Sequence, residues 1–282
     1  MKKTVLITGA AGQVGQVLRR SLRKDYNLVL TDLRDPDDLE SSEIFHPADL
    51  RNFEKIPPML KDVDGIIHLA AISTEPEARA DINRAFDVNV MGTANLYLAA
   101  ALAGVKRIVF ASTHHVQGMH PVTKTMYIDT PRAPDGVYAG TKIVGEDLSR
   151  EFATAKLGHK IFIVRVGSYQ PFPQEKRHMA TWISPRDFER LVIIGLESPK
   201  APGKTVFGVS DNSVGIWRNG AALTEDLGYY PQDSADNFPE ARSEGEKYLR
   251  HGGAFAVTTL EARSRALALP AINPLIPLPQ RR

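Results

Sequence analysis

The chain has 282 residues, of which 43% are hydrophobic, and its 35 basic and 33 acidic residues give a formal net charge of +2. This length can bury a full core as one large domain or as one domain with a smaller lobe, and no basic stripe points to a nucleic-acid partner. The absence of cysteine excludes disulfides, thiolate catalysis and cysteine-based zinc sites. No stretch is long enough to span a bilayer, and the apolar run after Met1-Lys2-Lys3 is too short for a signal peptide, so we expect a cytoplasmic protein without a membrane partner.

The first predicted elements are a strand, a glycine-rich turn and a helix. Lys3 to Thr8 is a short apolar run typical of a buried strand, and Gly9, Gly12 and Gly15 follow it at intervals of three. Apolar residues then recur at helical spacing from Val14 to Leu22. Glycines in such a turn let the backbone approach a pyrophosphate, which the amide groups of a helix N-terminus bind. The pattern predicts a dinucleotide-binding loop.

A second predicted strand, Asn27 to Thr31, ends in Asp32. A carboxylate at this place hydrogen-bonds the adenosine ribose and repels a 2′-phosphate, which favours NAD over NADP. Arg34 follows two residues later and leaves the strength of that preference open. Further along, Asp49-Leu50 places a carboxylate where it can meet the adenine ring.

Strand and helix patterns continue to alternate as far as residue 170. Repeated βα units imply an α/β fold with a parallel, doubly wound sheet, which is a Rossmann-type core over residues 1–170. The later strands are predicted at Gly65–Ala71, Arg107–Ala111 and Lys160–Val166, and the helices at Ala80–Ala103 and Tyr138–Ala155.

The pattern changes after Gly167, where several prolines interrupt regular structure. We expect residues 171–269 to form a smaller substrate-binding lobe over the C-terminal edge of the sheet, where ligands bind in open α/β sheets. The proline-containing residues 270–282 predict an extended or disordered tail. Within the lobe, the pattern predicts a helix at Asp187–Leu196 and a short strand at Thr205–Phe207.

Tyr138 and Lys142 lie four residues apart near the start of a predicted helix, so they share one helix face. A tyrosine hydroxyl with a pKa of about 10 is a poor base at neutral pH, but a nearby ammonium group and an oxidised nicotinamide favour the phenolate. On a chain with a dinucleotide-binding loop, this pair predicts an oxidoreductase in which Tyr138 is the general base.

In their order along the chain, these motifs resemble the extended short-chain dehydrogenase/reductase family. The matching strings are Thr8 to Gly15, Asp32, Asp49-Leu50, His68-Leu69-Ala70, Asn89-Val90, Ala111-Ser112-Thr113 and Tyr138 to Lys142. The resemblance implies that Thr113 hydrogen-bonds the reacting oxygen, that Tyr138 is the base, and that Lys142 tunes Tyr138 and grips the nicotinamide ribose. The expected cofactor is NAD, contacted by Gly9, Gly12, Gln13, Val14, Gly15, Asp32, Asp49, Leu50, Leu69, Ala70, Ala71, Asn89, Ser112, Tyr138 and Lys142.

Within this family, strings along nearly the whole chain resemble uronate dehydrogenases, which oxidise hexuronic acids at C1 to aldarolactones with NAD. The most telling string is Arg177 to Ser184, and the guanidinium fork of Arg177 suits bidentate recognition of a sugar carboxylate. One departure is Ser112-Thr113-His114-His115, where the pattern of these enzymes has Ser-Ser-Asn-His, so the sugar preference stays open. The resemblance implies substrate contacts from Ser73, Thr113, His114, His115, Tyr138, Ser168, Arg177 and Phe255.

The sequence leaves other functions open. A neutral aldose 1-dehydrogenase would use the same chemistry, because only Arg177 argues for a carboxylate. A nucleotide-sugar epimerase or dehydratase is a second alternative, although dehydratases place an Asp-Glu pair where this chain has His114-His115. A non-catalytic NAD(P)-binding regulator is the third, and it would not need the Tyr138/Lys142 pair.

The expected partners are a sugar-acid substrate and further copies of the chain. The family resemblance suggests a homo-oligomer packed partly through the helices at 80–103 and 138–155, of a size that the sequence leaves open. No metal site is expected, because side chains of adjacent histidines point in different directions and no carboxylate spacing supports one.

Overall fold

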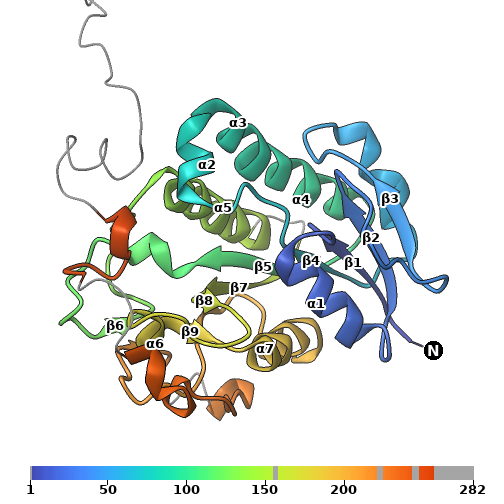
Figure 1. Cartoon of the computed structure of the whole chain (residues 1–282). Coiled ribbons are helices and arrows are strands. Elements are labelled where there is room, and N and C mark those ends of the chain that lie inside the picture. Colours follow the sequence, from blue (N-terminus) through green and yellow to red (C-terminus); the bar gives the residue numbers. More distant parts are fainter. Residues whose placement is uncertain (1, 155–157, 221–224, 243–247, 257–282) are drawn as a thin grey trace, which may run out of the picture.

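The computed structural model describes residues 2–154, 158–220, 225–242 and 248–256, so the predicted tail at 270–282 lies outside the described residues. Its centre is a seven-stranded parallel sheet with the strand order β3-β2-β1-β4-β5-β7-β10 (Figure 1). The order runs one way from β1 and the other way from β4, which confirms the predicted doubly wound α/β fold. The strands of this sheet are β1 (Thr4–Thr8), β2 (Asn27–Asp32), β3 (Ile44–Pro47), β4 (Gly65–His68), β5 (Arg107–Thr113), β7 (Lys160–Val166) and β10 (Thr205–Gly208).

Helices cover both faces of the sheet. In Figure 1, α2 to α5 lie above the sheet, whereas α1 and α7 lie below it. Among the described residues, no helix is long and apolar enough to cross a membrane. The helices are α1 (Gln13–Leu22), α2 (Glu75–Ala80), α3 (Ile82–Phe86), α4 (Gly92–Leu102), α5 (Val137–Thr154) and α7 (Pro185–Glu197).

Two apolar cores hold these layers together. On one face, Leu18 of α1 and Phe188 of α7 pack against the strands, and both side chains are fully buried. On the other face, Leu96 and Tyr97 of α4 are buried with Phe110 of β5. Burying a side chain of this size contributes about 2 kcal/mol. These cores fix the ends of the strands, where the site lies.

The long helix predicted at Ala80–Ala103 is divided in the structure. α2 begins earlier, at Glu75, and the chain is extended at Asp81, whose side chain accepts the Arg84 N–H and so starts α3. A π-helical turn, Asp87–Met91, then joins α3 to α4. The spacing of apolar residues alone cannot reveal such breaks, because the residues on either side of a break keep the same buried face.

The sheet extends beyond the predicted boundary at residue 170. β10 pairs with β7, and α7 packs on the sheet through Phe188 and Leu191. Residues after 170 therefore contribute both a strand and a helix to the Rossmann-type layers, and the predicted lobe of residues 171–269 does not begin where the sheet ends. The remaining short elements are β6 (Met126–Tyr127) with β11 (Trp217–Arg218), β8 (Ser168–Tyr169) with β9 (Trp182–Ile183), α6 (His178–Thr181), and 3₁₀ turns at Phe53–Lys55, Pro57–Leu60, His114–Gln117, Ala235–Asn237, Pro239–Arg242 and Gly253–Phe255.

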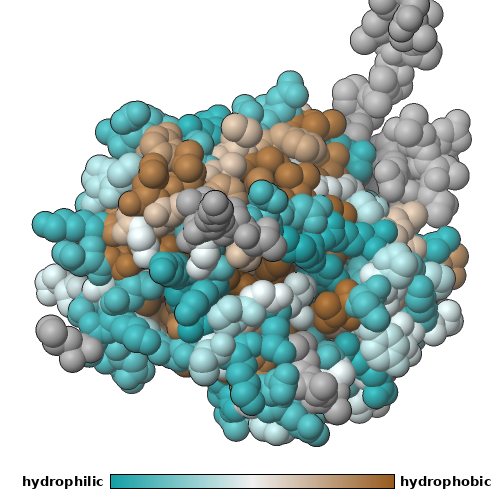
Figure 2. Space-filling view, turned by 180° about the vertical axis from the view of Figure 1, so that it is seen from behind, coloured by the Kyte–Doolittle hydropathy of each residue, from teal (hydrophilic) through white to brown (hydrophobic). Residues whose placement is uncertain are grey.

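Large apolar side chains remain exposed on the helices of one layer. Figure 2 shows apolar side chains gathered in the upper part of the face opposite that of Figure 1. On α3, the π-helical turn and α4, the exposed apolar residues are Ile82, Phe86, Met91, Leu98 and Leu102.

Candidate active site

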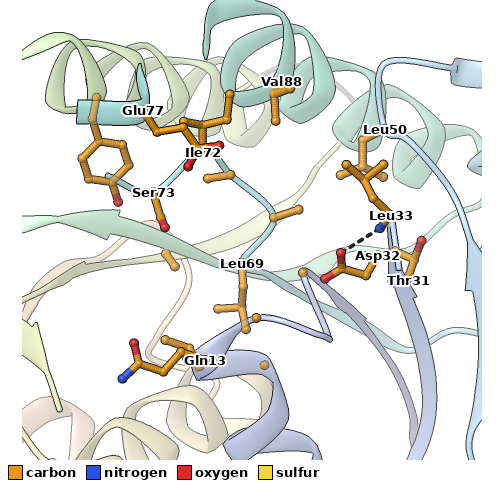
Figure 3. Close-up of a pocket in the computed structure, with 18 of the residues that line it drawn as sticks. Gln13, Thr31, Asp32, Leu33, Leu50, Leu69, Ile72, Ser73, Glu77 and Val88 are labelled. Carbon is orange, nitrogen blue, oxygen red and sulfur yellow. Dashed lines mark hydrogen bonds between the residues drawn. The ribbon is translucent and has the colours of Figure 1, made fainter. Parts of the chain in front are cut away.

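A cleft of about 680 Å³ is lined by the residues that follow β1, β2 and β4, at the point where the strand order reverses. Figure 3 shows Gln13 at the start of α1, Asp32 at the end of β2 and Ser73 beyond β4 around this cleft. Open α/β sheets bind their ligands at such a point. The lining includes these predicted residues: Gly9, Gly12, Gln13, Val14, Gly15, Asp32, Asp49, Leu50, Leu69, Ala70, Ala71, Ser73, Ser112, Tyr138 and Lys142. It also includes Ala111 of the Ala111-Ser112-Thr113 motif, and residues that the motifs did not single out, which are Thr31, Leu33, Ala48, Ile72, Glu77, Arg84, Val88, Val166 and Phe188.

Two positions of the glycine loop, Gly9 and Gly15, have no room for a side chain. Gly9 has φ +72°, which favours glycine, and a Cβ there would lie 2.8 Å from the backbone nitrogen of Ala70. A Cβ at Gly15 would lie 2.2 Å from the carbonyl oxygen of Gly9. The loop therefore packs against the end of β4, and α1 packs against the loop. The result is a backbone cradle at a helix N-terminus, which fits the pyrophosphate of a dinucleotide.

Asp32, at the end of β2, lines this cleft. Its Oδ2 accepts the Ala11 N–H at 2.9 Å. Its Oδ1 accepts the Leu33 N–H at 2.7 Å, the bond drawn as a dashed line in Figure 3. Ala11 belongs to the glycine loop, so the carboxylate ties the end of β2 to the phosphate cradle. Each oxygen keeps a lone pair that can accept a ribose hydroxyl. Arg34 also lines the cleft.

Asp49 and Leu50 line the cleft where the sequence places the adenine. The Asp49 carboxylate binds Arg51, with Oδ2 2.6 Å from Nη2 and Oδ1 2.9 Å from the backbone nitrogen. The hydrogen bonds from Arg51 outweigh burial and lower the pKa of Asp49. Asp49 is therefore an ionised hydrogen-bond acceptor that Arg51 holds in place.

Asn89, predicted to contact the cofactor, lies behind the cleft rather than in its lining. Its Oδ1 accepts the Ile72 N–H at 2.7 Å, and its Nδ2 donates to the Ile72 carbonyl at 3.0 Å and to Thr141 Oγ1 at 2.9 Å. The side chain is therefore occupied in joining the segment after β4, which carries Ser73, to helix α5. Asn89 sits in the π-helical turn, a feature that often marks functional sites.

A buried histidine joins β1, β4 and α4 beneath the cleft. The Thr93 hydroxyl donates to the Asn89 carbonyl at 2.6 Å, so it accepts a hydrogen bond from His68 Nε2 at 2.9 Å. Nδ1 of His68 then accepts from the Thr8 hydroxyl at 2.8 Å. Burial, helped by the charge of Lys142, lowers the pKa of His68 to about 3 and keeps it neutral. His68 belonged to a matching motif, but only the structure gives it this structural role.

Thr113, Tyr138 and Lys142 meet where β5 and α5 come together. The hydroxyl of Thr113 accepts the His115 N–H at 3.3 Å, so its hydrogen is free to bind Tyr138, and that bond favours the phenolate. The Lys142 Nζ lies 4.9 Å from the Phe110 ring centroid and 6.0 Å from that of Tyr138. Burial raises the pKa of Tyr138 and lowers that of Lys142 to about 7, while pairing of the two charges would oppose both shifts.

Ser112 lines the cleft, and its hydroxyl is held by a buried ion pair. It donates to Glu146 Oε1 at 2.7 Å, and Arg165 donates to both Glu146 oxygens, at 2.8 Å through Nε and 2.9 Å through Nη2. Burial alone would raise the pKa of Glu146, but the hydrogen bonds and charge of Arg165 outweigh it, so the pKa is lowered. The network joins β5, β7 and α5, and β5 and α5 carry the predicted catalytic residues.

The Glu146→Gln variant is expected to lower the free energy of unfolding at pH 7 by about 3 kcal/mol, because Arg165 would keep a buried charge without its partner. The folded-state pKa of Glu146 is depressed, so its contribution is present above the unfolded-state pKa of about 4.3 and is lost as the pH falls through the folded-state value. Denaturant unfolding at pH 7 and pH 3.5 should therefore show a smaller difference between variant and wild type at the lower pH. An equal difference at both pH values would contradict this account.

His114 and His115 follow Thr113 and have different partners. His114 Nδ1 donates to the Val166 carbonyl at 3.1 Å, and burial, with the nearby charges of His115 and Arg177, lowers its pKa well below the usual value. The neutral ring therefore presents Nε2 as an acceptor, which is buried and has no hydrogen-bond partner among the described residues. His115 Nδ1 lies 2.5 Å from Asp135 Oδ2.

The predicted residues of the C-terminal part lie around these histidines. The ring of Phe255 contacts His115 edge-on, with centroids 5.8 Å apart. The Ser168 hydroxyl bonds that of Thr181 at 2.7 Å. Arg177 binds Glu175 through Nε and Nη2, at 3.1 Å and 3.0 Å, but its Nη1 is buried and finds no partner in the part of the chain that the structure describes. Arg177 lines a second cavity, of about 660 Å³, rather than the cleft beside Tyr138.

Comparison with known proteins identifies the family. Residues 5–185 match the model of the NAD dependent epimerase/dehydratase family. Uronate dehydrogenase of Pseudomonas syringae pv. tomato is 33% identical over 90% of this chain and 93% of its own length. Glucuronic acid dehydrogenase from Chromohalobacter salexigens superposes with a TM-score of 0.84 at 35% identity, over 92% of this chain and 98% of that one. A mutant uronate dehydrogenase from Agrobacterium tumefaciens, complexed with NAD, superposes with a TM-score of 0.83 at 34% identity, over 91% of this chain and 97% of that one. The chain therefore belongs to the NAD dependent epimerase/dehydratase family, in which uronate dehydrogenases are among its relatives.

Proposed function

We propose that the protein oxidises a hexuronic acid at C1 to the aldarolactone with NAD as the cofactor. The observation that carries the proposal is that Tyr138 and Lys142 line a cleft whose glycine loop fits a dinucleotide, with Thr113 hydrogen-bonded to Tyr138. The similarity to uronate dehydrogenases over most of the chain supports the same activity. When bound, NAD supplies the acceptor for the hydride that leaves C1.

Residues of the chain accept the proton and hold the reacting oxygen. Tyr138, as the phenolate, takes the proton of the C1 hydroxyl, and the Thr113 hydroxyl holds that oxygen while its bond to carbon becomes a double bond. The ammonium group of Lys142 stabilises the phenolate. The sugar ring stays closed, so removal of a hydride and a proton at C1 gives a lactone.

Two buried polar atoms suit a sugar acid. Nη1 of Arg177 can donate to a carboxylate, and Nε2 of His114 can accept from a sugar hydroxyl. Buried polar groups are ordinarily hydrogen-bonded, so these two atoms, which have no partner among the described residues, support a ligand contact. Nε2 of His114, unlike the Arg177 guanidinium, can only accept a hydrogen bond. A sugar hydroxyl that faces it must therefore donate its hydrogen.

An assay of NADH formation tests this proposal. The absorbance of NADH is followed with galacturonate, glucuronate, galactose, glucose, xylose and arabinose as substrates. Turnover of the uronates alone would support the carboxylate contact of Arg177, whereas turnover of neutral sugars would favour the aldose 1-dehydrogenase alternative. Conversion of UDP-sugars without net NADH would favour an epimerase. Cofactor binding without any turnover would favour a regulator.

Replacing Asp32 with serine is expected to raise the preference for NADP over NAD, measured as the ratio of kcat/KM values, by about 100-fold, because a carboxylate beside a 2′-phosphate costs several kcal/mol. An additional Arg34→Ala change should lower NADP use again, since Arg34 lines the same part of the cleft. A ratio within twofold of the wild-type value in Asp32→Ser would show that Asp32 does not set the cofactor preference.

We also propose that copies of the chain associate through α3, α4 and α5. The exposed apolar residues of α3, the π-helical turn and α4 support this, because apolar side chains gathered on one face are typical of a protein–protein contact. Light scattering after size-exclusion chromatography gives the oligomeric state. A monomer at micromolar concentration would overturn this proposal.

A further inference from the structure

The start of the catalytic helix α5 is bound by a carboxylate from another helix. Glu75 is the first residue of α2 and is 5% exposed. Its Oε1 accepts the Val137 N–H at 2.9 Å, and its Oε2 accepts the Tyr138 N–H at 2.8 Å. Arg79 Nη2 donates to Oε1 at 2.6 Å and balances the buried negative charge. Glu75 therefore satisfies two of the amide groups that a helix leaves unpaired at its N-terminus.

The residues directly before α5 do not supply this cap. Asp135 is of a type that often caps helices, but its carboxylate is paired with His115. Gly136 has no side chain, and a Cβ there would lie 2.1 Å from the Glu75 carboxyl carbon. The glycine thus leaves the space that the Glu75 carboxylate fills, where a negative charge also complements the helix dipole.

We propose that Glu75 is a positioning residue for Tyr138. It holds the backbone of the base directly, and so sets where the phenol stands relative to Thr113 and Lys142. Ser73, which lines the cleft, precedes Glu75 by two residues, so the same segment carries a predicted substrate contact and the support of the base. The kinetic consequence rests on the proposed function, whereas the cap itself does not.

The Glu75→Gln variant keeps the shape of the side chain but replaces one acceptor oxygen with an NH₂ group, which would face a backbone N–H or Arg79. We expect kcat to fall by about 100-fold, because a displacement of 1 Å at a reacting group can cost that much. The KM for NAD should stay within threefold, since the glycine loop and Asp32 are untouched. The apparent pKa of the kcat profile should shift, because the phenol would leave its place beside Lys142.

Two further variants separate positioning from stability. Gly136→Ala should reproduce the loss of kcat with Glu75 present, because the new Cβ would displace the carboxylate. Glu43→Gln makes the same chemical change at another buried carboxylate, which binds Arg19 and lies away from the base. It should lower the melting temperature and leave kcat and its pH profile unchanged.

Hydrogen exchange of the ligand-free protein tests the cap without any substrate. Amides in a peptide covering Val137 to Thr141 should exchange about ten times faster in Glu75→Gln than in the wild type, and no faster in Glu43→Gln. If none of the sugar acids supports NAD reduction by the wild type, the proposed function fails. The exchange measurement still decides whether Glu75 caps α5. Unchanged exchange in Glu75→Gln, or an unchanged kcat and pH profile in both Glu75→Gln and Gly136→Ala, would overturn the positioning role.

Discussion

The Tyr138→Phe variant is expected to lower kcat for NAD-dependent uronate oxidation by about 10³-fold, the contribution of a well-placed general base. The change removes one oxygen and leaves the ring that packs at the cleft, so the fold and the affinity for NAD should be retained. Initial rates of NADH formation at saturating sugar and NAD measure kcat, and calorimetric titration measures NAD binding.

Tyr230→Phe provides the matched control, because this tyrosine is exposed and lies outside the cleft. It should keep the wild-type kcat. A Tyr138→Phe enzyme with a kcat within tenfold of the wild type would show that another group takes the proton.

Replacing Arg177 with methionine is expected to lower kcat/KM for galacturonate by about 100-fold, the effect of removing one partner from a buried charge pair. The stem of the methionine fills much of the same space, so the loss should come from the carboxylate contact. Galactose has no carboxylate, and its kcat/KM should change less than threefold. The measured quantity is the ratio of the two values in the variant and in the wild type.

Arg218→Met removes an exposed arginine whose Nε donates to the Gly215 carbonyl, and it should leave this ratio unchanged. If Arg177→Met weakened both sugars equally, Arg177 would act on the fold of the C-terminal part through Glu175 rather than on the carboxylate. If it weakened neither, the carboxylate would be bound elsewhere.

The sequence predicts the parts of the site whose residues lie close together in the chain and form short motifs. The glycine loop must turn within a few residues, so Gly9 and Gly15 stand close together in the chain, and the cleft lies where they place it. The Tyr138/Lys142 pair is likewise set by the periodicity of one helix. Most of the doubly wound sheet follows from alternating apolar runs, and its order from the rules for βα units.

The parts that the sequence does not reveal depend on contacts between distant segments. The pairing of His115 with Asp135 needs Gly118 and Gly252, since a Cβ at either would lie within 2 Å of the carboxylate, at 1.9 Å and 1.8 Å. Glu75 reaches α5 across 62 residues. Asn89 sits in a π-helical turn that apolar spacing cannot indicate, and its side chain binds Ile72 and Thr141 instead of lining the cleft. The strand β10 follows a proline-rich stretch, and the sequence around it does not show which strand it pairs with. Its place in the main sheet follows from its pairing with β7, which only the structure shows.

The most direct test of the proposed oxidation uses galacturonate carrying deuterium at C1. We expect the deuterium to appear in the reduced cofactor, detected by mass spectrometry as NADH heavier by one mass unit, while the sugar acid is recovered as the lactone or its hydrolysis product without deuterium at C1. Retention of deuterium in the sugar, with unlabelled NADH or with none, would contradict hydride transfer from C1.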